Sequence, residues 1–147
     1  MADDFFRITN TVALLAWVAL LVRPGDRRVS GLLCAVLVPG ALAAAYAAVI
    51  GWRLFSGGGE GGDPTTIAGL QAIFADDWVV AAAWTHYLVF DMVVGAWIAR
   101  DAVRLSIPWP LRTLALLFTF LLGPAGFLLH LATRWARAGE IAVGDRA

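Results

Sequence analysis

The sequence predicts an all-α membrane protein in which four transmembrane helices form one bundle, with a short amphipathic helix at the membrane surface. Hydrophobic residues make up 61% of the 147 residues, whereas soluble domains contain roughly 45–50% apolar residues. The mean hydropathy is +0.77. Four separate stretches approach the length of about 20 predominantly apolar residues that a spanning helix needs. We therefore expect residues 1–147 to form a single transmembrane domain.

The predicted spans alternate between short and long connections. They cover residues 5–22, 29–52, 78–98 and 109–135. The connections after the first and third spans are short, which favours antiparallel neighbours. The second connection is longer and contains a glycine-rich tract, 56–62, that we expect to be flexible. We expect the polar tail, 137–147, to be disordered.

An amphipathic helix is predicted in this longer connection, between the second and third spans. Asp63 precedes Pro64, an order typical of an N-cap followed by the first helical position. Ile67, Leu70 and Phe74 then recur on one helical face. Such a helix is expected to lie in the plane of the membrane surface.

Composition excludes several classes of function. The 11 basic and 11 acidic residues balance, so there is no basic excess with which to bind nucleic acid. All the basic residues are arginine, and Schiff-base chemistry needs a lysine amine. The single cysteine, Cys34, allows neither an intramolecular disulfide nor a zinc site of the CxxC type, and we expect it to be a small buried side chain.

The arginines weakly favour an orientation with both termini outside. Six arginines lie in or beside the first and third connections, and five lie on the opposite side: Arg23, Arg27, Arg28, Arg100, Arg104 and Arg112 against Arg7, Arg53, Arg134, Arg137 and Arg146. The side with more arginine is expected to face the cytoplasm. Asp3 and Asp4 replace the positive start of a leader peptide, so we expect a retained first helix in a bacterial cytoplasmic membrane.

Asp91 is the most informative residue because it lies inside the apolar third span. A carboxylate near the bilayer midplane costs roughly 2.5–3.5 kcal/mol, so it requires a partner or a function. His86, five residues earlier, lies about 140° around the same helix. The third span should therefore contact neighbours on two sides and lie centrally. Arg100 is too far along the helix, and on the opposite face, to pair with Asp91.

A second set of polar and small residues recurs at helical spacing in the predicted fourth span: Thr119, Gly123, Gly126, His130 and Arg134. Pro124 predicts a kink there. In an unbroken span His130 and Arg134 would share one half of the membrane with Asn10, Tyr46 and His86, and Asp91 would lie near the level of Thr119. The sequence thus predicts a polar pocket. Small residues also permit close helix approach and homo-oligomers.

Three linked motifs carry a family resemblance. They are Trp84-x-His86-x4-Asp91, Gly95-Ala-Trp97-Ile98-x-Arg100-Asp101, and Thr119-Phe120-x2-Gly123-Pro124-x-Gly126-x3-His130-x3-Arg134. Over residues 84–134 the chain resembles the abscisic-acid-deficient-four-like family of integral membrane proteins, whose plant member is associated with neoxanthin synthesis. The chain departs from the family pattern at Ala96, where the resemblance leads us to expect an arginine.

The resemblance implies a non-redox isomerisation of an epoxy-carotenoid to an allenic carotenoid, with no cofactor. Such a reaction needs an acid for the epoxide oxygen and a base for a carbon-bound proton. Burial disfavours the charged form of both side-chain types, so Asp91 is the candidate acid and His86 or His130 the candidate base. The candidate substrate-binding residues are Asn10, Tyr46, Trp84, Trp97, Thr119 and Arg134.

Two alternatives stay open. The chain can be a non-catalytic membrane protein that binds a carotenoid, quinone or other lipid, or that forms an oligomeric assembly. A metal site would need His86, Asp91 and His130 to converge on one ion, and the 140° offset within the third span argues against it. We therefore expect no metal, and a membrane lipid or isoprenoid as the partner molecule.

Overall fold

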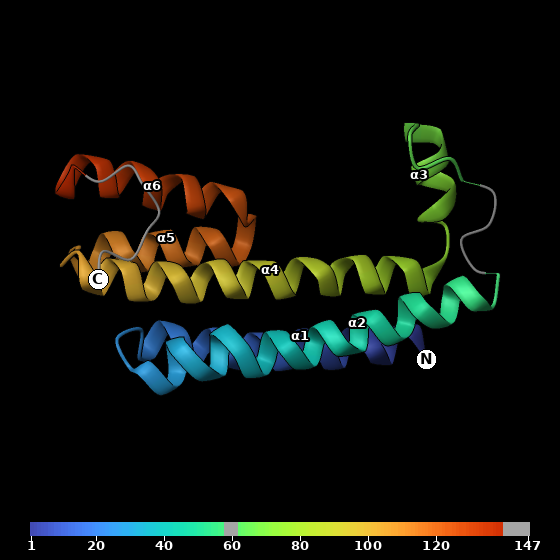
Figure 1. The fold of residues 1–147 in the computed structure, drawn as a ribbon, viewed down its shortest axis with the longest axis horizontal. Coiled ribbons are helices and arrows are strands. Elements are labelled where there is room, and N and C mark those ends of the chain that lie inside the picture. Colours follow the sequence, from blue (N-terminus) through green and yellow to red (C-terminus); the bar gives the residue numbers. More distant parts are fainter. Residues whose placement is uncertain (58–61, 140–147) are drawn as a thin grey trace.

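The computed structural model describes residues 1–57 and 62–139, and every regular element in these ranges is a helix (Figure 1). In chain order the elements are α1 (Ala2–Val22), η1 (Arg27–Leu37), α2 (Val38–Phe55), α3 (Ile67–Ile73), α4 (Asp77–Arg104), α5 (Trp109–Leu122) and α6 (Pro124–Ala138). Three segments are long and apolar enough to cross a membrane: α1, the continuous η1–α2 segment and α4. The prediction of an all-helical, membrane-compatible fold is confirmed.

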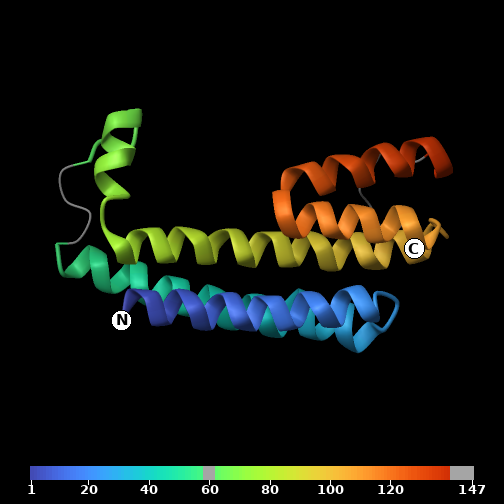
Figure 2. The same cartoon turned by 180° about the vertical axis from the view of Figure 1, so that it is seen from behind.

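Helix α4 lies at the centre of the molecule. The antiparallel pair α1 and η1–α2 covers one side of α4, and α5 and α6 lie on the other side (Figures 1 and 2). Contacts join α4 to α1, η1, α2, α5 and α6. This agrees with the expectation, drawn from the angular offset between His86 and Asp91, that the third predicted span has neighbours on two sides.

The predicted single span over 109–135 is wrong, because the chain reverses in its middle. Helix α5 ends at Leu122, Gly123 has a φ of 48°, and Pro124 begins α6, which packs back along α5 (Figure 1). Glycine adopts a positive φ readily. Proline lacks the N–H that would extend α5, but it suits the first turn of a new helix. The combination converts the expected kink into a hairpin.

The α5–α6 hairpin is too short to cross a bilayer in either direction. Its helices contain 14 and 15 residues, which at 1.5 Å per residue span about 21–23 Å, against a hydrocarbon core of about 30 Å. These dimensions fit a re-entrant hairpin, which enters and leaves on one side. Gly139 therefore lies at the opposite end of the bundle from Met1 (Figures 1 and 2), and the expectation that both ends of the chain share one side loses its basis.

Two expected irregular segments lie largely outside the described ranges. Of the glycine-rich tract 56–62, residues 58–61 are not described, and of the tail 137–147, residues 140–147 are not described. The start of the tail is corrected, because α6 continues through Ala138.

The short helix between the second and third spans is present, but it begins later than predicted. Thr66 is its N-cap, and its hydroxyl accepts a hydrogen bond from the Gly69 N–H (3.0 Å). Asp63 instead accepts a hydrogen bond from the Thr65 N–H (2.9 Å). In both views α3 stands roughly perpendicular to α4 (Figures 1 and 2). A helix lying at the surface of a membrane crossed by α4 would have this orientation.

Asp76 connects the end of the second span to the start of the third. Its carboxylate pairs with Arg53 at the end of α2. The same carboxylate caps α4 by accepting a hydrogen bond from the Trp78 N–H (2.9 Å). Capping of this kind satisfies an otherwise unpaired backbone donor. The pair therefore fixes the distance between α2 and α4 at this end of the bundle.

The first part of the second span is a π-helix, η1. Pro39 follows it closely, and a proline ring clashes with the carbonyl four residues earlier in a regular α-helix. The wider turns of η1 give that carbonyl room. Cys34 in η1 is fully buried, as expected, and its thiol lies 3.4 Å from the Ala16 carbonyl oxygen of α1.

Trp17 is the main packing contact between α1 and the rest of the bundle. Its side chain is buried against α4, where a Cβ atom added to Gly95 would lie 2.3 Å from the indole ring. The indole also packs against Phe120 of α5, with ring centroids 5.4 Å apart. Gly95 therefore provides the space that lets one aromatic side chain connect three helices.

Replacement of Gly95 by alanine should destabilise the fold. The added methyl group overlaps the Trp17 indole, and overpacking of this kind costs about 1–3 kcal/mol. We expect a lower midpoint of thermal unfolding for G95A in detergent micelles, measured by circular dichroism. The matched control is G40A in α2, where an added Cβ meets no atom within 4 Å. Equal midpoints for both variants would contradict the packing role of Gly95.

Candidate functional site

A buried ionic cluster lies where α6 meets the last turns of α4. Its centre is Asp101, which is 6% exposed. The Oδ2 atom of Asp101 lies 2.8 Å from His130 Nε2 and 3.0 Å from Arg134 Nε. Its Oδ1 atom lies 2.8 Å from a terminal nitrogen of Arg104. His130 and Arg134 are fully buried, so the α6 side of the cluster is closed to solvent, whereas Arg104 is partly exposed.

The helical spacing explains how these four side chains meet. His130 and Arg134 are four residues apart on α6, and Asp101 and Arg104 are three residues apart on α4, so each pair occupies one face of its helix. The reversal at Gly123 then turns the α6 face toward the end of α4. Desolvating ionic groups costs several kcal/mol for each ion, and the shared carboxylate of Asp101 offsets part of that cost.

Trp97 covers this cluster from one turn earlier on α4. Its ring lies perpendicular to the His130 imidazole, with centroids 5.1 Å apart. The guanidinium of Arg134 lies over the same indole at 5.5 Å, a favourable cation–π geometry. Phe127 of α6 packs on it as well, with centroids 5.8 Å apart. Trp97 therefore contacts both members of the cluster that α6 supplies.

The orientation of the His130 ring separates the roles of its two nitrogens. Nε2 faces the Asp101 carboxylate, which accepts a proton donor, so in the neutral imidazole Nε2 carries the hydrogen and Nδ1 keeps its lone pair. Within the described part of the chain, Nδ1 is buried and has no hydrogen-bond partner. A carboxylate that holds one nitrogen while the other stays available is the arrangement found in catalytic acid–histidine pairs.

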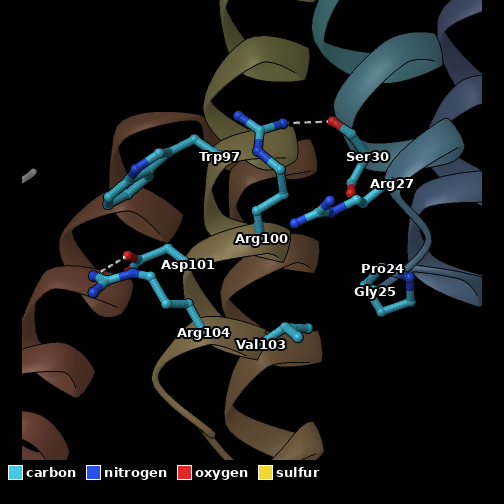
Figure 3. A pocket seen from close by; sticks show the side chains of 9 residues that line it. All are labelled: Pro24, Gly25, Arg27, Ser30, Trp97, Arg100, Asp101, Val103 and Arg104. Carbon is cyan, nitrogen blue, oxygen red and sulfur yellow. Dashed lines mark hydrogen bonds and ion pairs between the residues drawn. The ribbon is translucent and has the colours of Figure 1, made fainter. Parts of the chain in front are cut away.

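A cavity of about 440 Å³ adjoins the cluster, on the side of α4 that faces η1 (Figure 3). It is lined by Pro24, Gly25, Arg27, Ser30, Trp97, Arg100, Asp101, Val103 and Arg104. Its volume falls within the range of small-molecule sites. Asp101 and Arg104 belong to both the cavity wall and the cluster, and Trp97 lines the cavity while it contacts His130. A molecule bound in the cavity would affect His130 through Asp101 and Trp97.

Asp91, the candidate acid, lies at the tip of the α5–α6 hairpin. A Cβ atom added to Gly123 would lie 2.7 Å from Asp91 Oδ1, so the absence of a side chain at Gly123 lets the carboxyl group approach the turn. Thr119, one turn before Gly123, is fully buried and donates its hydroxyl hydrogen to the Ala115 carbonyl (2.8 Å). Asp91 and Thr119 thus lie at similar positions along the axis of the bundle, as expected, but these positions are next to the tip of the hairpin.

The other candidates form two contacts on the N-terminal half of α4. The indole N–H of Trp84 donates a hydrogen bond to Asn10 Oδ1 (3.0 Å). The ring of His86 lies 5.7 Å from that of Tyr46, centroid to centroid, and His86 is exposed on the surface of the helix. These residues pair as neighbours, and none of them contacts the Asp101 cluster.

The structure therefore separates residues that an unbroken fourth span would have placed together. On α4, Asp101 follows His86 by fifteen positions and Asp91 by ten. These separations are about 22 Å and 15 Å along the helix. His130 and Arg134 join Asp101 because α6 runs in the opposite direction to the one expected. In the described residues no three His, Cys, Asp or Glu side chains converge as a metal site would require.

Sequence reasoning did not select Asp101 as a site residue. Its signal was available, since it belongs to the second family motif, follows Trp97 by four residues and shares its helical face, but it lies beyond the end of the predicted span at residue 98. Ala96 is fully buried in the core and does not line the cavity. The departure from the family pattern at Ala96 therefore lies in the packing between helices.

Comparisons with known proteins give one match. A family model described as ABA DEFICIENT 4-like matches residues 4–130 of the chain, a range that extends from the start of α1 to His130. No curated protein and no solved structure matches.

Removing the carboxylate of Asp101 should destabilise the protein strongly. The D101L variant leaves buried cationic groups without their shared partner, which costs about 3–5 kcal/mol, and the midpoint of thermal unfolding in micelles should fall. The double variant D101L/R134M removes charge from both sides and should regain part of that loss. The control D77N changes an exposed carboxylate at the start of α4. A midpoint for D101L equal to that of D77N would exclude a stabilising role for the cluster.

Proposed function

The chain belongs to the ABA DEFICIENT 4-like family, and on this premise we propose that it is a membrane-embedded isomerase of a carotenoid or similar isoprenoid lipid. The reaction uses general acid–base chemistry and needs no redox cofactor. The observation that carries the proposal is the buried His130–Asp101 pair, whose imidazole Nδ1 has no hydrogen-bond partner among the described residues.

His130 is the proposed base. The Asp101 carboxylate holds the proton of the neutral imidazole on Nε2 and stabilises the imidazolium that forms after proton transfer. The lone pair on Nδ1 then accepts the carbon-bound proton. Asp101 also contacts Arg104 and Arg134, and these contacts fix the position of the carboxylate beside the imidazole. Positioned bases of this kind contribute about 10²–10⁴-fold to a rate.

A guanidinium group is the proposed stabiliser of the epoxide oxygen. The C–O bond of the epoxide breaks as the C–H bond gives its proton to His130. The resulting alkoxide then takes one proton from the imidazolium, which restores neutral His130 and leaves a hydroxyl group, so atoms and electrons balance without an oxidant. Arginine stays charged and stabilises the developing negative charge through hydrogen bonds. Asp91 lies about 15 Å along α4 from Asp101, which is too far for it to serve the same bond.

The position of the cavity suits the polar end group of an isoprenoid. The cavity lies at the arginine-rich end of the helices (Figure 3), whereas the outer faces of the helices are apolar, with Leu121 and Leu128 among the exposed side chains. A hydrocarbon chain can follow those faces while its oxygenated ring stays near the interface. Because His130 is fully buried, a substrate reaches Nδ1 only when Trp97 or α6 shifts.

The distribution of arginine supports an orientation with the N-terminus outside. The hairpin moves two arginines to the end of the bundle that contains the α1–η1 turn. Of the ten arginines in the described residues, eight lie toward this end and two toward the other: Arg23, Arg27, Arg28, Arg100, Arg104, Arg112, Arg134 and Arg137 against Arg7 and Arg53. The positive-inside rule places the richer end in the cytoplasm of a bacterial cell.

A second candidate is a non-catalytic membrane protein that binds an isoprenoid or another lipid. The complete burial of His130 and Arg134 favours it, because a buried ionic cluster also serves to hold two helices together. Under this alternative the cavity and the apolar surface bind the ligand, and the cluster has a structural role only.

The isomerase proposal predicts a difference between the two histidines. H130Q should lower the conversion of an epoxy-carotenoid by about 10²–10⁴-fold, measured by pigment chromatography with protein reconstituted in lipid vesicles. H86Q should convert at close to the wild-type rate, because His86 lies about 22 Å along α4 from Asp101. H86Q is the matched control, because it makes the same histidine-to-glutamine change elsewhere in the same helical bundle.

Three outcomes would decide against the proposal. Full conversion by H130Q, or loss of conversion by H86Q alone, would remove His130 from the reaction. If the wild-type protein retains the carotenoid through purification, as shown by its absorption bands, but does not convert it, the non-catalytic alternative is the better account.

A further inference from the structure

We propose that the Arg27–Arg100 wall of the cavity binds a phosphate group, supplied by the headgroup of an anionic membrane lipid or by a soluble phosphate. The site shares this cavity with Asp101 of the proposed acid–base pair, but neither Arg27 nor Arg100 belongs to that pair, and the site does not depend on whether the protein is an isomerase. Arg27 belongs to η1 and Arg100 to α4, so the wall is formed by two segments that are distant in the sequence.

The cavity lining carries more positive than negative charge. Three arginines line the cavity and one carboxylate, that of Asp101. Both oxygens of this carboxylate are already engaged, Oδ1 by Arg104 and Oδ2 by the two side chains from α6. It therefore cannot neutralise Arg27 or Arg100.

The described part of the chain supplies no other counter-ion for these two arginines. Within residues 1–57 and 62–139, no carboxylate forms an ion pair with Arg27 or with Arg100. Arg100 donates one hydrogen bond to the Ser30 carbonyl, which leaves its positive charge uncompensated. Asp26 precedes Arg27 in the sequence, but its carboxylate accepts a hydrogen bond from the Arg28 backbone N–H and forms no ion pair with the Arg27 side chain.

Arg27 and Arg100 line the same cavity. In Figure 3 both side chains extend into the space between η1 and α4, and Arg100 reaches the Ser30 carbonyl. Two like charges at such a site repel one another, and an anion bound between them would relieve that repulsion. Guanidinium groups match phosphate oxygens with paired hydrogen bonds, whereas a neutral ligand would leave both charges uncompensated.

The position of the cavity in the bundle is suited to a phosphate group. Pro24 and Gly25 of the α1–η1 turn form part of its lining, so the cavity lies at the level where a transmembrane segment ends. Phosphates of lipid headgroups occupy that level, and basic pockets between helices on the cytoplasmic side bind such headgroups. The surplus of arginine at this end of the bundle attracts anions to it.

Lipid retention provides the test. The full chain is reconstituted in nanodiscs that contain equal parts of phosphatidylcholine and phosphatidylglycerol, then transferred to detergent and examined by native mass spectrometry for bound lipid. We expect wild-type protein to retain phosphatidylglycerol preferentially. R27Q and R100Q should each weaken that retention about tenfold, since one charged hydrogen bond contributes about 1.5 kcal/mol. The control is R28Q, an arginine next to Arg27 that does not line the cavity.

A second measurement distinguishes the source of the phosphate. Inorganic phosphate is added to delipidated protein, and the midpoint of thermal unfolding is compared for wild type, R27Q and R100Q. Retention of phosphatidylglycerol without a response to inorganic phosphate assigns the site to a lipid headgroup. A rise in midpoint that both variants lose assigns it to a soluble phosphate. Equal loss of retention in R28Q would indicate general surface attraction and would overturn the proposal, as would the absence of any response to both probes. Because the two variants are tested singly, misfolding of one leaves the other as a test.

Discussion

The contact between Asp101 and the two buried side chains of α6 determines how the second half of the protein is arranged. Most of the contact surface of α6 is with α5, and its contacts with α4 are fewer. The shared carboxylate is therefore the principal polar link between the hairpin and the central helix. Without it, α6 would present a histidine and an arginine to lipid, where unpaired ionic groups are costly. The position of Trp97 and the shape of the cavity wall follow from the same contact.

Hydropathy and charge predicted the long elements well, because the signal for a spanning helix is spread over about twenty residues. The central place of α4 was also predicted, from two polar residues separated by 140°, but His86, one of the two, is exposed on the helix surface, so the outcome agrees without that reason. The hairpin was not predicted, because the spacing that places Thr119 near Gly123, and His130 near Arg134, is the same in one helix as in two. Only the backbone conformation of Gly123 distinguishes a kink from a reversal, and a proline motif alone does not reveal it.

One local feature would have favoured the hairpin. Gly126 is the point where α6 approaches α5 most closely, and a Cβ atom there would lie 2.1 Å from the Thr119 backbone nitrogen. Two glycines that flank a proline, Gly123-Pro124-x-Gly126, therefore provide both a turn and room for two backbones side by side. The error at this turn propagated to the site, since it moved His130 and Arg134 to the other end of the bundle and left Asp101 unrecognised. A misjudged turn can thus displace a site by the length of a helix even when every helix is identified.

The short hairpin also gives the protein an unequal outline across the bilayer. Beyond the level of Gly123, α1, α2 and α4 are the described helices that continue through the membrane, whereas α5 and α6 add to the cross-section on the side of the α1–η1 turn. Each helix has a diameter of about 10 Å, so in a membrane the cross-sectional area of the protein would differ between the two leaflets. The described part of the molecule is therefore wider at the end that contains the α1–η1 turn. In a membrane crossed by α4, acyl chains would fill the step beneath the hairpin tip, and lipid packing around the protein would depend on membrane curvature and lateral pressure.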